Sequence, residues 1–272
     1  MTLLITIISL IILLFLIILF LTFPGGKNPE KEKPLYGRSY AHRGLHSKDK
    51  AIAENSLTAF KKAVESGYGI ELDLQLSADG NVMVFHDDSL KRVCGDDRLL
   101  KDVSTKELKT IKLLSTNDTI PEFSEVLALV DGKIPLIVEI KTCKNYAELS
   151  KKAYDLLKSY KGDYCIESFD PRIVGWFKKN AKEVLRGQLV TNIGDYGNKL
   201  EAFVLANAFG NFLGRPQFIA HNYIKKSLII KFIEKFTMKV AWTIRSEKNF
   251  EDIAKKTDAI IFEFFQPEKR FK

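Results

Sequence analysis

Short runs of apolar, β-branched residues alternate along most of the chain with longer segments whose apolar positions recur at helical spacing. The short runs predict strands. The longer segments predict helices, such as the one in which Leu57, Phe60 and Val64 share a face. The expected strands cover residues 39–41, 69–76, 82–85, 136–141, 164–169, 184–190, 218–221, 239–244 and 259–264. The expected helices cover residues 55–66, 121–130, 146–160, 171–180, 199–209, 224–236 and 247–256.

The order of these elements predicts a fold of the α/β class. Asp79-Gly80 is a strong hairpin signal, so residues 82–85 are expected to pair back onto residues 69–76. The remaining strands form eight β units, each usually followed by a helix, and this alternation implies a parallel sheet. Eight units over about 235 residues fit a closed (β/α)8 TIM barrel. A doubly wound open sheet is the alternative, and little chain follows the last strand to form an eighth helix.

Residues 3–23 form an uncharged run, almost entirely Leu, Ile and Phe, that is long enough to cross a bilayer as a helix. No basic residue precedes this run, it is longer than the apolar part of a signal peptide, and no small-residue cleavage site follows it. We therefore expect an uncleaved anchor rather than a signal peptide. The expected organisation is a transmembrane anchor over residues 1–23, a polar linker over residues 24–37 and the barrel over residues 38–272.

The charge of the chain is basic but diffuse, with a net value of +8. Such a balance suits anionic partners, such as phosphate esters or an acidic membrane surface. No basic block interleaved with aromatic residues occurs, so nucleic acid is not expected as a partner. Lys27, Lys31, Lys33 and Arg38 follow the apolar run. The positive-inside rule then predicts a single-pass membrane protein whose barrel lies in the cytoplasm.

Three carboxylates lie on strands that a barrel would bury. Glu71 and Asp73 alternate along one strand and so share a face, and Glu139 interrupts an apolar run. Unpaired carboxylates are costly in strands that are covered on both sides. One bound cation would account for all three residues. A set of carboxylates without a thiolate favours one hard divalent cation, Mg²⁺ or Ca²⁺, over Zn²⁺.

Basic side chains fall at the ends of the same strands, where the chemistry of such barrels takes place. His42 and Arg43 end the first expected strand, His86 ends the hairpin strand, and Lys141 ends the strand that contains Glu139. Histidine ionises near neutral pH, so two imidazoles can divide the acid and base roles. Arginine can bind a phosphate bidentately, and lysine adds a point charge. Together these residues predict metal-assisted attack on a phosphate ester.

A series of short motifs matches a known family in order and spacing. They are His42-Arg43-Gly44, Glu54-Asn55-Ser56, Glu71-Leu72-Asp73, His86-Asp87, Leu90-Lys91-Arg92 with Gly95, Ile120-Pro121, Glu139-Ile140-Lys141, Glu167-Ser168-Phe169 and Val240-Ala241-Trp242-Thr243. Through these motifs, residues 38–265 resemble the glycerophosphodiester phosphodiesterase family. The resemblance implies a TIM barrel with a small insertion after strand two, here between about Gly80 and Pro121.

The resemblance also implies a role for each matched residue. His42 and His86 match the family's acid/base pair, Glu71, Asp73 and Glu139 match its metal ligands, and Arg43 and Lys141 match its phosphate contacts. Asn55 would hold the site from the first helix turn, or it is an ordinary helix cap. Phe169 and Trp242 would line the organic part of the substrate, or they are ordinary core aromatics.

The implied reaction is metal-dependent hydrolysis of a glycerophosphodiester to glycerol 3-phosphate and an alcohol. The anchor favours one alternative, a lysophospholipase D that meets lysophospholipids at the bilayer. A non-catalytic barrel that binds phosphate esters would have lost a catalytic position, whereas all seven matched polar residues are present. A phosphoinositide-type phospholipase C also uses two histidines on a similar barrel, but it fits the Glu-x-Asp and Glu-x-Lys motifs less well.

The end of the chain departs from the family pattern. Family members often close with an Asp near the end of the last strand, followed by a Pro, whereas this chain reads Ile261-Phe-Glu-Phe-Phe-Gln-Pro267. The resemblance therefore does not define the back of the pocket or the size of the substrate. Ser56 stands where Thr is common and keeps the hydroxyl group.

Overall fold

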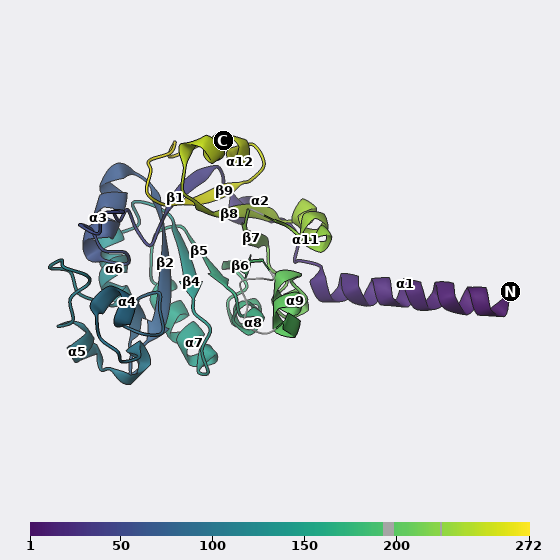
Figure 1. Cartoon of the computed structure of the whole chain (residues 1–272), viewed down its shortest axis with the longest axis horizontal. Helices are drawn as coiled ribbons and strands as arrows, with labels where there is room; N and C mark the ends of the chain where they lie inside the picture. The colour runs from purple at the N-terminus through teal and green to yellow at the C-terminus, as the bar shows by residue number, and fades with distance from the viewer. Residues whose placement is uncertain (193–198, 224) are drawn as a thin grey trace.

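The computed structural model describes residues 1–192, 199–223 and 225–272, and eight parallel strands close into a barrel (Figure 1). The barrel strands are β1 (Arg38–His42), β2 (Gly69–Leu76), β4 (Leu136–Ile140), β5 (Tyr164–Ser168), β6 (Leu185–Val190), β7 (Phe218–Asn222), β8 (Met238–Ile244) and β9 (Ala259–Phe262). β1 pairs in parallel with both β2 and β9, which closes the sheet. The predicted TIM barrel is therefore confirmed, and the open sheet is wrong because it would leave two edge strands unpaired.

Helices follow most of the strands. They are α3 (Leu57–Ser66), α6 (Phe123–Val130), α7 (Tyr146–Leu157), α8 (Pro171–Asn180), α9 (Lys199–Ala206), α10 (Asn211–Gly214), α11 (Leu228–Ile233) and α12 (Glu247–Ala254), with a 3₁₀ turn, η3 (Glu234–Phe236), after α11. α8 starts where its sequence indicates, because Asp170 caps it and Pro171 occupies the first turn. The helix expected over residues 224–236 begins at Leu228, and residue 224 lies outside the described residues.

Apolar side chains fill both sides of the barrel wall. Tyr40 and Phe218 belong to the group that fills the interior, and Phe60, Leu72 and Phe177 belong to the layer between the strands and the helices. All five are buried. The interior is thus a packed core, so a site has room only at the ends of the strands.

The connection after β2 is the expected insertion. It contains the antiparallel strand β3 (Val82–Val84), α4 (Lys91–Cys94), the 3₁₀ turn η1 (Leu100–Asp102) and α5 (Thr105–Leu108). The turn into β3 places Gly80 at a φ of 77°, which glycine adopts without strain. The insertion has a small apolar core of its own, built around side chains such as Phe85, so it is a compact unit beside the barrel.

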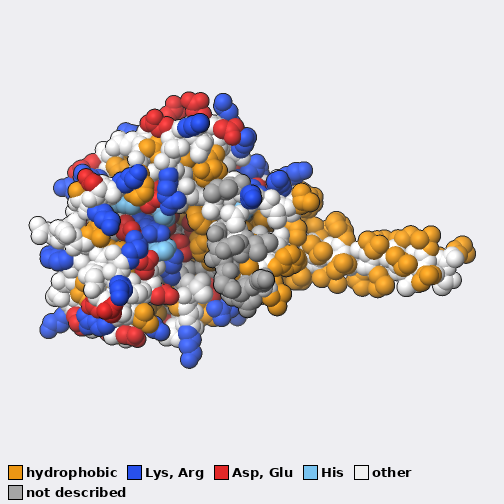
Figure 2. All heavy atoms as spheres, viewed as in Figure 1, with side chains coloured by type: hydrophobic (Ala, Val, Ile, Leu, Met, Phe, Trp, Pro, Cys, Tyr) orange, Lys and Arg blue, Asp and Glu red, His pale blue; other side chains and the backbone are white. Residues whose placement is uncertain are grey.

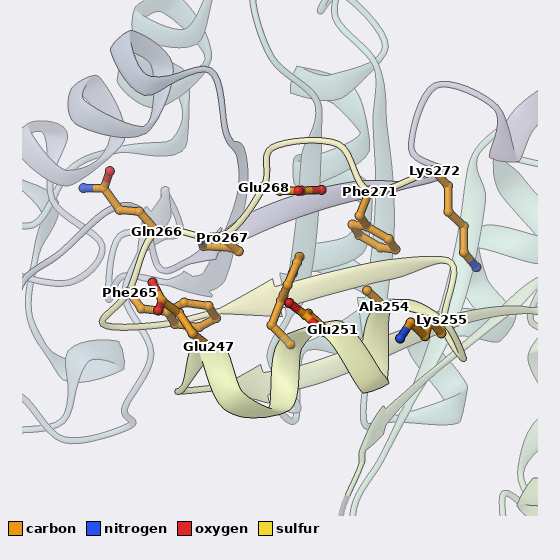
Figure 3. Close-up of a pocket in the computed structure, with 11 residues that line it drawn as sticks. Glu247, Glu251, Ala254, Lys255, Phe265, Gln266, Pro267, Glu268, Phe271 and Lys272 are labelled. Carbon is orange, nitrogen blue, oxygen red and sulfur yellow. The ribbon is translucent and has the colours of Figure 1, made fainter.

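An extended tail, and no helix, follows β9. Residues 263–272 return along β1, where the Ser39 amide donates to the Lys269 carbonyl at 3.1 Å. The Tyr68 hydroxyl donates to the Pro267 carbonyl at 2.7 Å. A cavity of about 630 Å³ lies between α12 and this tail. Figure 3 shows side chains that line it, and none of the predicted site residues is among its lining residues.

The amino-terminal segment begins with α1 (Thr2–Thr22), which projects from the barrel (Figure 1). α1 has 21 residues, and an 18-residue window within it has a mean hydropathy of 3.5 and is not buried. Among the described residues, α1 alone meets the length and hydropathy of a membrane span. Residues 24–37, which were expected to form a linker, contain the short α2 (Pro29–Glu32) and pack on the barrel. Leu35 is 2 % exposed and belongs to the interior core with Tyr40.

Candidate active site

The strand register brings the expected acidic residues to one level of the barrel. His42 lies opposite Glu71, Asp73 lies opposite Glu139, and Glu139 lies opposite Glu167 on the next strand. Residues two apart on a strand point to the same side. The side chains of β1, β2, β4 and β5 therefore converge on one place near the carboxyl ends of the strands.

Three of these carboxylates form a tight cluster. One oxygen from each of Glu71, Asp73 and Glu139 lies within 4.8 Å of the others, and all three residues are buried. Lys141 Nζ lies 2.8 Å from Glu139 Oε1 and 3.4 Å from Asp73 Oδ1. Burial raises the pKa of Glu71, as does the charge of Asp73, and burial also raises the pKa of Glu139. Burial by itself raises the pKa of Asp73 as well, but the charges of Lys141 and His86 outweigh it and lower that pKa.

A fourth carboxylate, Glu167, adds to the negative charge. Its Oε2 is buried without a hydrogen-bond partner among the described residues, and burial raises its pKa well above the ordinary value. Burying an acceptor without a donor is costly, and a cation beside it would offset that cost. Since all four groups offer oxygen atoms, the cluster fits a hard divalent cation.

His42 lies between two acidic side chains. Its Nε2 is 3.9 Å from Glu71 Oε2 and its Nδ1 is 3.5 Å from Glu263 Oε1. Glu263 also lies 3.1 Å from His46 Nε2 and accepts a hydrogen bond from Arg245 Nε at 2.6 Å. Burial lowers the pKa of His42 to about 4 against the opposing effect of Glu263, so the ring is neutral at neutral pH.

A chain of charged contacts connects the second histidine to the first strand. His86 Nδ1 lies 2.6 Å from Asp87 Oδ1. Arg92 donates to Asp87 at 2.6 Å and to Glu54 at 2.6 Å, and Arg43 donates to Glu54 at 2.7 Å. Burial by itself raises the pKa of Glu54, but the hydrogen bond from Arg92 and the charge of Arg43 lower it to about 2. Because Arg92 lies on α4, these contacts join the insertion to the strand ends.

Asn55 contacts the acidic cluster from the loop before α3. Its Nδ2 donates to Asp73 Oδ2 at 2.9 Å, whereas Ser56 provides the N-cap of α3. Arg43 and Asn55 have φ values of 54° and 52°. Residues other than glycine adopt this left-handed conformation at an energetic cost, and such positions cluster at functional sites.

The converging side chains surround a cavity of about 120 Å³. His42, Arg43, His86 and the aromatic pair Phe169 and Trp242 line it, and the two aromatic rings meet edge to face with centroids 5.8 Å apart. Figure 2 shows histidine, acidic and basic side chains gathered on the visible face of the barrel. Three expected site residues do not line the cavity. Asp73 and Lys141 contact the lining side chains of Arg43 and Glu139, and Asn55 contacts Asp73.

This arrangement has a counterpart among known proteins. The model of the glycerophosphoryl diester phosphodiesterase family matches residues 42–264, which include every expected site residue. The chain belongs to this family.

Individual members of the family show different degrees of similarity. The glycerophosphodiester phosphodiesterase of Caldanaerobacter subterraneus is 32 % identical over 143 residues, a match that covers 49 % of this chain and 55 % of that protein. The lysophospholipase D of Rattus norvegicus is 29 % identical over 159 residues, covering 54 % of this chain and 49 % of that protein. The chain thus matches about half the length of these two relatives.

A solved structure extends the comparison to the fold. An Oleispira antarctica phosphodiesterase, in complex with the product sn-glycerol-3-phosphate, aligns with a TM-score of 0.69 and 22 % identity. The alignment covers 84 % of this chain and 94 % of that one, so the two share their barrel fold.

Several residues at the site of this family member were given no role from the sequence. They are Glu54, Asp87, Arg92, Glu167, Arg245, His46 and Glu263. Glu167 and Glu263 carry the signal that indicated Glu139, because each is a lone acidic residue in an apolar strand sequence. Glu54 stands in the Glu54-Asn55-Ser56 motif, but neither a strand nor an apolar run indicated its role, because its partners Arg43 and Arg92 come from the end of β1 and from α4.

Proposed function

We propose that this protein hydrolyses glycerophosphodiesters to glycerol 3-phosphate and an alcohol, assisted by one divalent cation, Mg²⁺ or Ca²⁺. The observation that carries the proposal is the convergence of buried carboxylates, two histidines and an arginine on one cavity. Membership of the family supports the class of reaction. The name of the Caldanaerobacter relative supports the class of substrate.

The acidic cluster would hold the cation. Glu71, Asp73 and Glu139 supply one oxygen each, and Glu167 lies beside them. A bound divalent cation would act as a Lewis acid on the phosphate oxygens and stabilise the charge that develops on them. Because burial raises the pKa of Glu71 and Glu139, we expect cation binding to release protons and to weaken as the pH falls.

The basic side chains would carry out the remaining steps. Arg43 would bind the non-bridging phosphate oxygens, and Lys141 would balance the charge of the carboxylates that it contacts. Of His42 and His86, one would take the proton from the attacking oxygen. The other would protonate the departing alcohol, whose own pKa is too high for easy departure at neutral pH. Both imidazoles are needed whether water or the substrate's own glycerol hydroxyl attacks first.

Phe169 and Trp242 would contact the organic part of the substrate. They line the wall of a cavity of only about 120 Å³. A space of this volume suits a phosphoglycerol group and leaves the rest of the diester outside.

The test of the paired-imidazole mechanism uses His42→Ala and His86→Ala, each assayed for choline release from glycerophosphocholine. We expect each variant to lose at least about 100-fold in kcat. His221→Gln is the matched control, because His221 is a histidine that does not line the cavity. Near wild-type turnover in either alanine variant would show that the mechanism is wrong.

A lysophospholipase D activity is the second candidate, and α1 is the observation that favours it. A barrel attached to a bilayer meets lipid substrates at high effective concentration. The two candidates separate when kcat/KM is measured on glycerophosphocholine and on lysophosphatidylcholine in the same vesicles. Faster turnover of the acylated substrate would support the second candidate against the first.

The same helix supports a single-pass membrane protein whose barrel faces the cytoplasm. The basic residues Lys27, Lys31 and Lys33 follow α1, as the positive-inside rule requires for this orientation. Protease added to spheroplasts should leave the barrel intact until the membrane is permeabilised. Digestion from outside would contradict the orientation.

A further inference from the structure

Exposed apolar side chains outside α1 concentrate on one side of the barrel. Of the nine large apolar side chains exposed beyond residue 23 in the described part of the chain, seven lie on α9, α10, α11 or η3. They are Leu200, Phe203, Val204, Leu213, Leu228, Phe232 and Phe236, and we call them the apolar patch. Protein surfaces normally carry such side chains singly, so a patch of this kind indicates a partner.

Basic residues accompany the patch. Lys225, Lys231 and Lys235 lie beside it in sequence, are exposed, and make no ion pair with any described residue. Lys226 differs, because it pairs with Glu234 at 2.7 Å. A surface that combines exposed Leu and Phe with unpaired Lys matches the interface of a bilayer rich in anionic lipids.

The patch is continuous with the end of α1. Figure 1 shows α9 and α11 on the side of the barrel from which α1 leaves. Phe20 of α1 packs on Phe212 of α10, with ring centroids 5.9 Å apart, and Phe23 packs on Phe236 at 5.0 Å. α1 therefore joins the barrel directly beside the patch, on the same side of the molecule.

Hydrogen bonds fix the helix against the barrel at this point. Asn211 Nδ2 donates to the Thr22 carbonyl at 2.7 Å. Arg215 Nη1 donates to the carbonyls of Phe20 and Phe23 at 2.8 and 2.6 Å. These are carbonyls that the end of a helix leaves without partners. The contacts set the direction of α1 relative to α10, so a membrane crossed by α1 would meet the barrel at a defined place.

We propose that the apolar patch is a second membrane contact, which lies in the headgroup region of an anionic phospholipid bilayer when α1 spans it. The inference rests on the anchoring role of α1 given above. A second copy of the chain is the other candidate occupant, but the three unpaired lysines beside the patch would repel those of a like copy and attract anionic lipid.

The test uses the full chain in vesicles of phosphatidylcholine with about 30 % phosphatidylglycerol. Single tryptophan substitutions report contact through quenching by lipids brominated near the headgroup, after subtraction of the signal of the native tryptophans. Phe203→Trp and Phe232→Trp sample the patch. Lys106→Trp is the control, because Lys106 is exposed on α5, far from α1 in Figure 1. Phe15→Trp lies near the middle of α1, so it is probed with lipids brominated along the acyl chain and samples α1 itself.

We expect the two patch positions to be quenched at least about threefold more strongly than Lys106→Trp. If Phe15→Trp is quenched while the patch positions behave as Lys106→Trp does, the second contact is wrong and the anchor stands. If Phe15→Trp is also unquenched, the anchor itself is wrong. Patch fluorescence that shifts to the blue with protein concentration in detergent, without quenching in vesicles, would identify a dimer and overturn the proposal.

The charge of the patch has a test of its own. Replacing Lys225, Lys231 and Lys235 together by Gln should reduce the quenching of Phe232→Trp at least about twofold in anionic vesicles, and leave it unchanged in pure phosphatidylcholine. A triple Lys→Gln variant at Lys61, Lys62 and Lys106, all exposed elsewhere, is the matched control. Equal effects of the two triple variants would contradict a specific contact.

Discussion

At the scale of single residues, the site is defined by carboxylates whose surroundings differ. Despite burial, the hydrogen bond from Arg92 and the charge of Arg43 lower the pKa of Glu54. Despite burial, hydrogen bonds with His42 and His46, and to a smaller extent with Arg245, lower the pKa of Glu263. Glu71, Glu139 and Glu167 are buried beside one another, and their pKa values are raised. The surroundings of the first two residues favour their ionised forms, and a bound cation would favour the ionised forms of the second group.

Glu263 is expected to position and tune His42. Its carboxylate lies 3.5 Å from His42 Nδ1 and stabilises the protonated ring. Glu263→Gln should therefore lower kcat about tenfold with little change in KM, and should shift the acidic limb of the pH profile to lower pH. Glu251→Gln, an exposed change on α12, is the control. An unchanged pH profile would restrict Glu263 to a structural role.

Glu167 is expected to lower the stability of the cation-free protein and to strengthen cation binding. Its pKa is raised by burial, so in the cation-free protein it costs stability as the pH rises above the ordinary value of a glutamate. Without cation, Glu167→Gln should increase the free energy of unfolding by roughly 1 kcal/mol, and more at pH 8 than at pH 5. The melting temperature should rise accordingly. The substitution should also weaken Mg²⁺ or Ca²⁺ binding. A melting temperature that falls at both pH values would contradict this account, and Glu247→Gln on α12 is the control.

At the scale of elements, the chain of contacts through Arg92 joins α4 of the insertion to the end of β1. Arg92 bonds Asp87 and Glu54, and Glu54 bonds Arg43. The insertion has its own small core, so these ion pairs, and not a shared apolar layer, align it with the site. The loop that carries His86 is held in the same way.

This connection predicts sensitivity to acid. The pKa of Glu54 is lowered to about 2, so its contribution to the free energy of unfolding is fully present above about pH 4.5 and is lost as the pH falls toward 2. The contribution has an upper bound of about 3 kcal/mol. Urea unfolding measures the free energy of unfolding at pH 7 and at pH 3. Between these pH values, Arg92→Met should lose less of this free energy than the wild type does, because the variant lacks the Arg92–Glu54 ion pair at both. Lys101→Met, an exposed change in the insertion, should behave as the wild type does.

At the scale of the whole molecule, the barrel brings together acidic residues that are far apart in the sequence. Glu71, Asp73, Glu139 and Glu167 come from three neighbouring strands and repel one another when they are ionised. The folded chain alone can present this cluster, so a cation that binds it stabilises the fold by mass action.

Mg²⁺ or Ca²⁺ should therefore raise the melting temperature of the full chain. At a concentration about 100 times Kd the gain is about 2.7 kcal/mol, or several degrees for a domain of this size. Scanning fluorimetry with and without EDTA measures the shift, and EDTA should abolish activity until cation is restored. Asp73→Asn should lose the shift. An equal shift in that variant would place the cation elsewhere.

The sequence predicts the elements, the parallel sheet and most of the converging residues, and it leaves a closed barrel and an open sheet as alternatives. Period-two and helical patterns depend on neighbours along the chain, and the apolar strand runs indicated strands buried on both sides. His42, Glu71, Asp73, His86 and Glu139 could be named because each follows or interrupts such a run.

Which side chains meet depends on contacts between segments that are distant in the sequence. Glu263 reaches His42 because β9 pairs with β1, which are separated by more than 200 residues. Residues 263–272 return along β1, and residues 24–37 pack on the barrel, where Leu35 is buried. Closure of the sheet sets these contacts, and no local pattern encodes closure. The same closure places α9 and α11 beside α1.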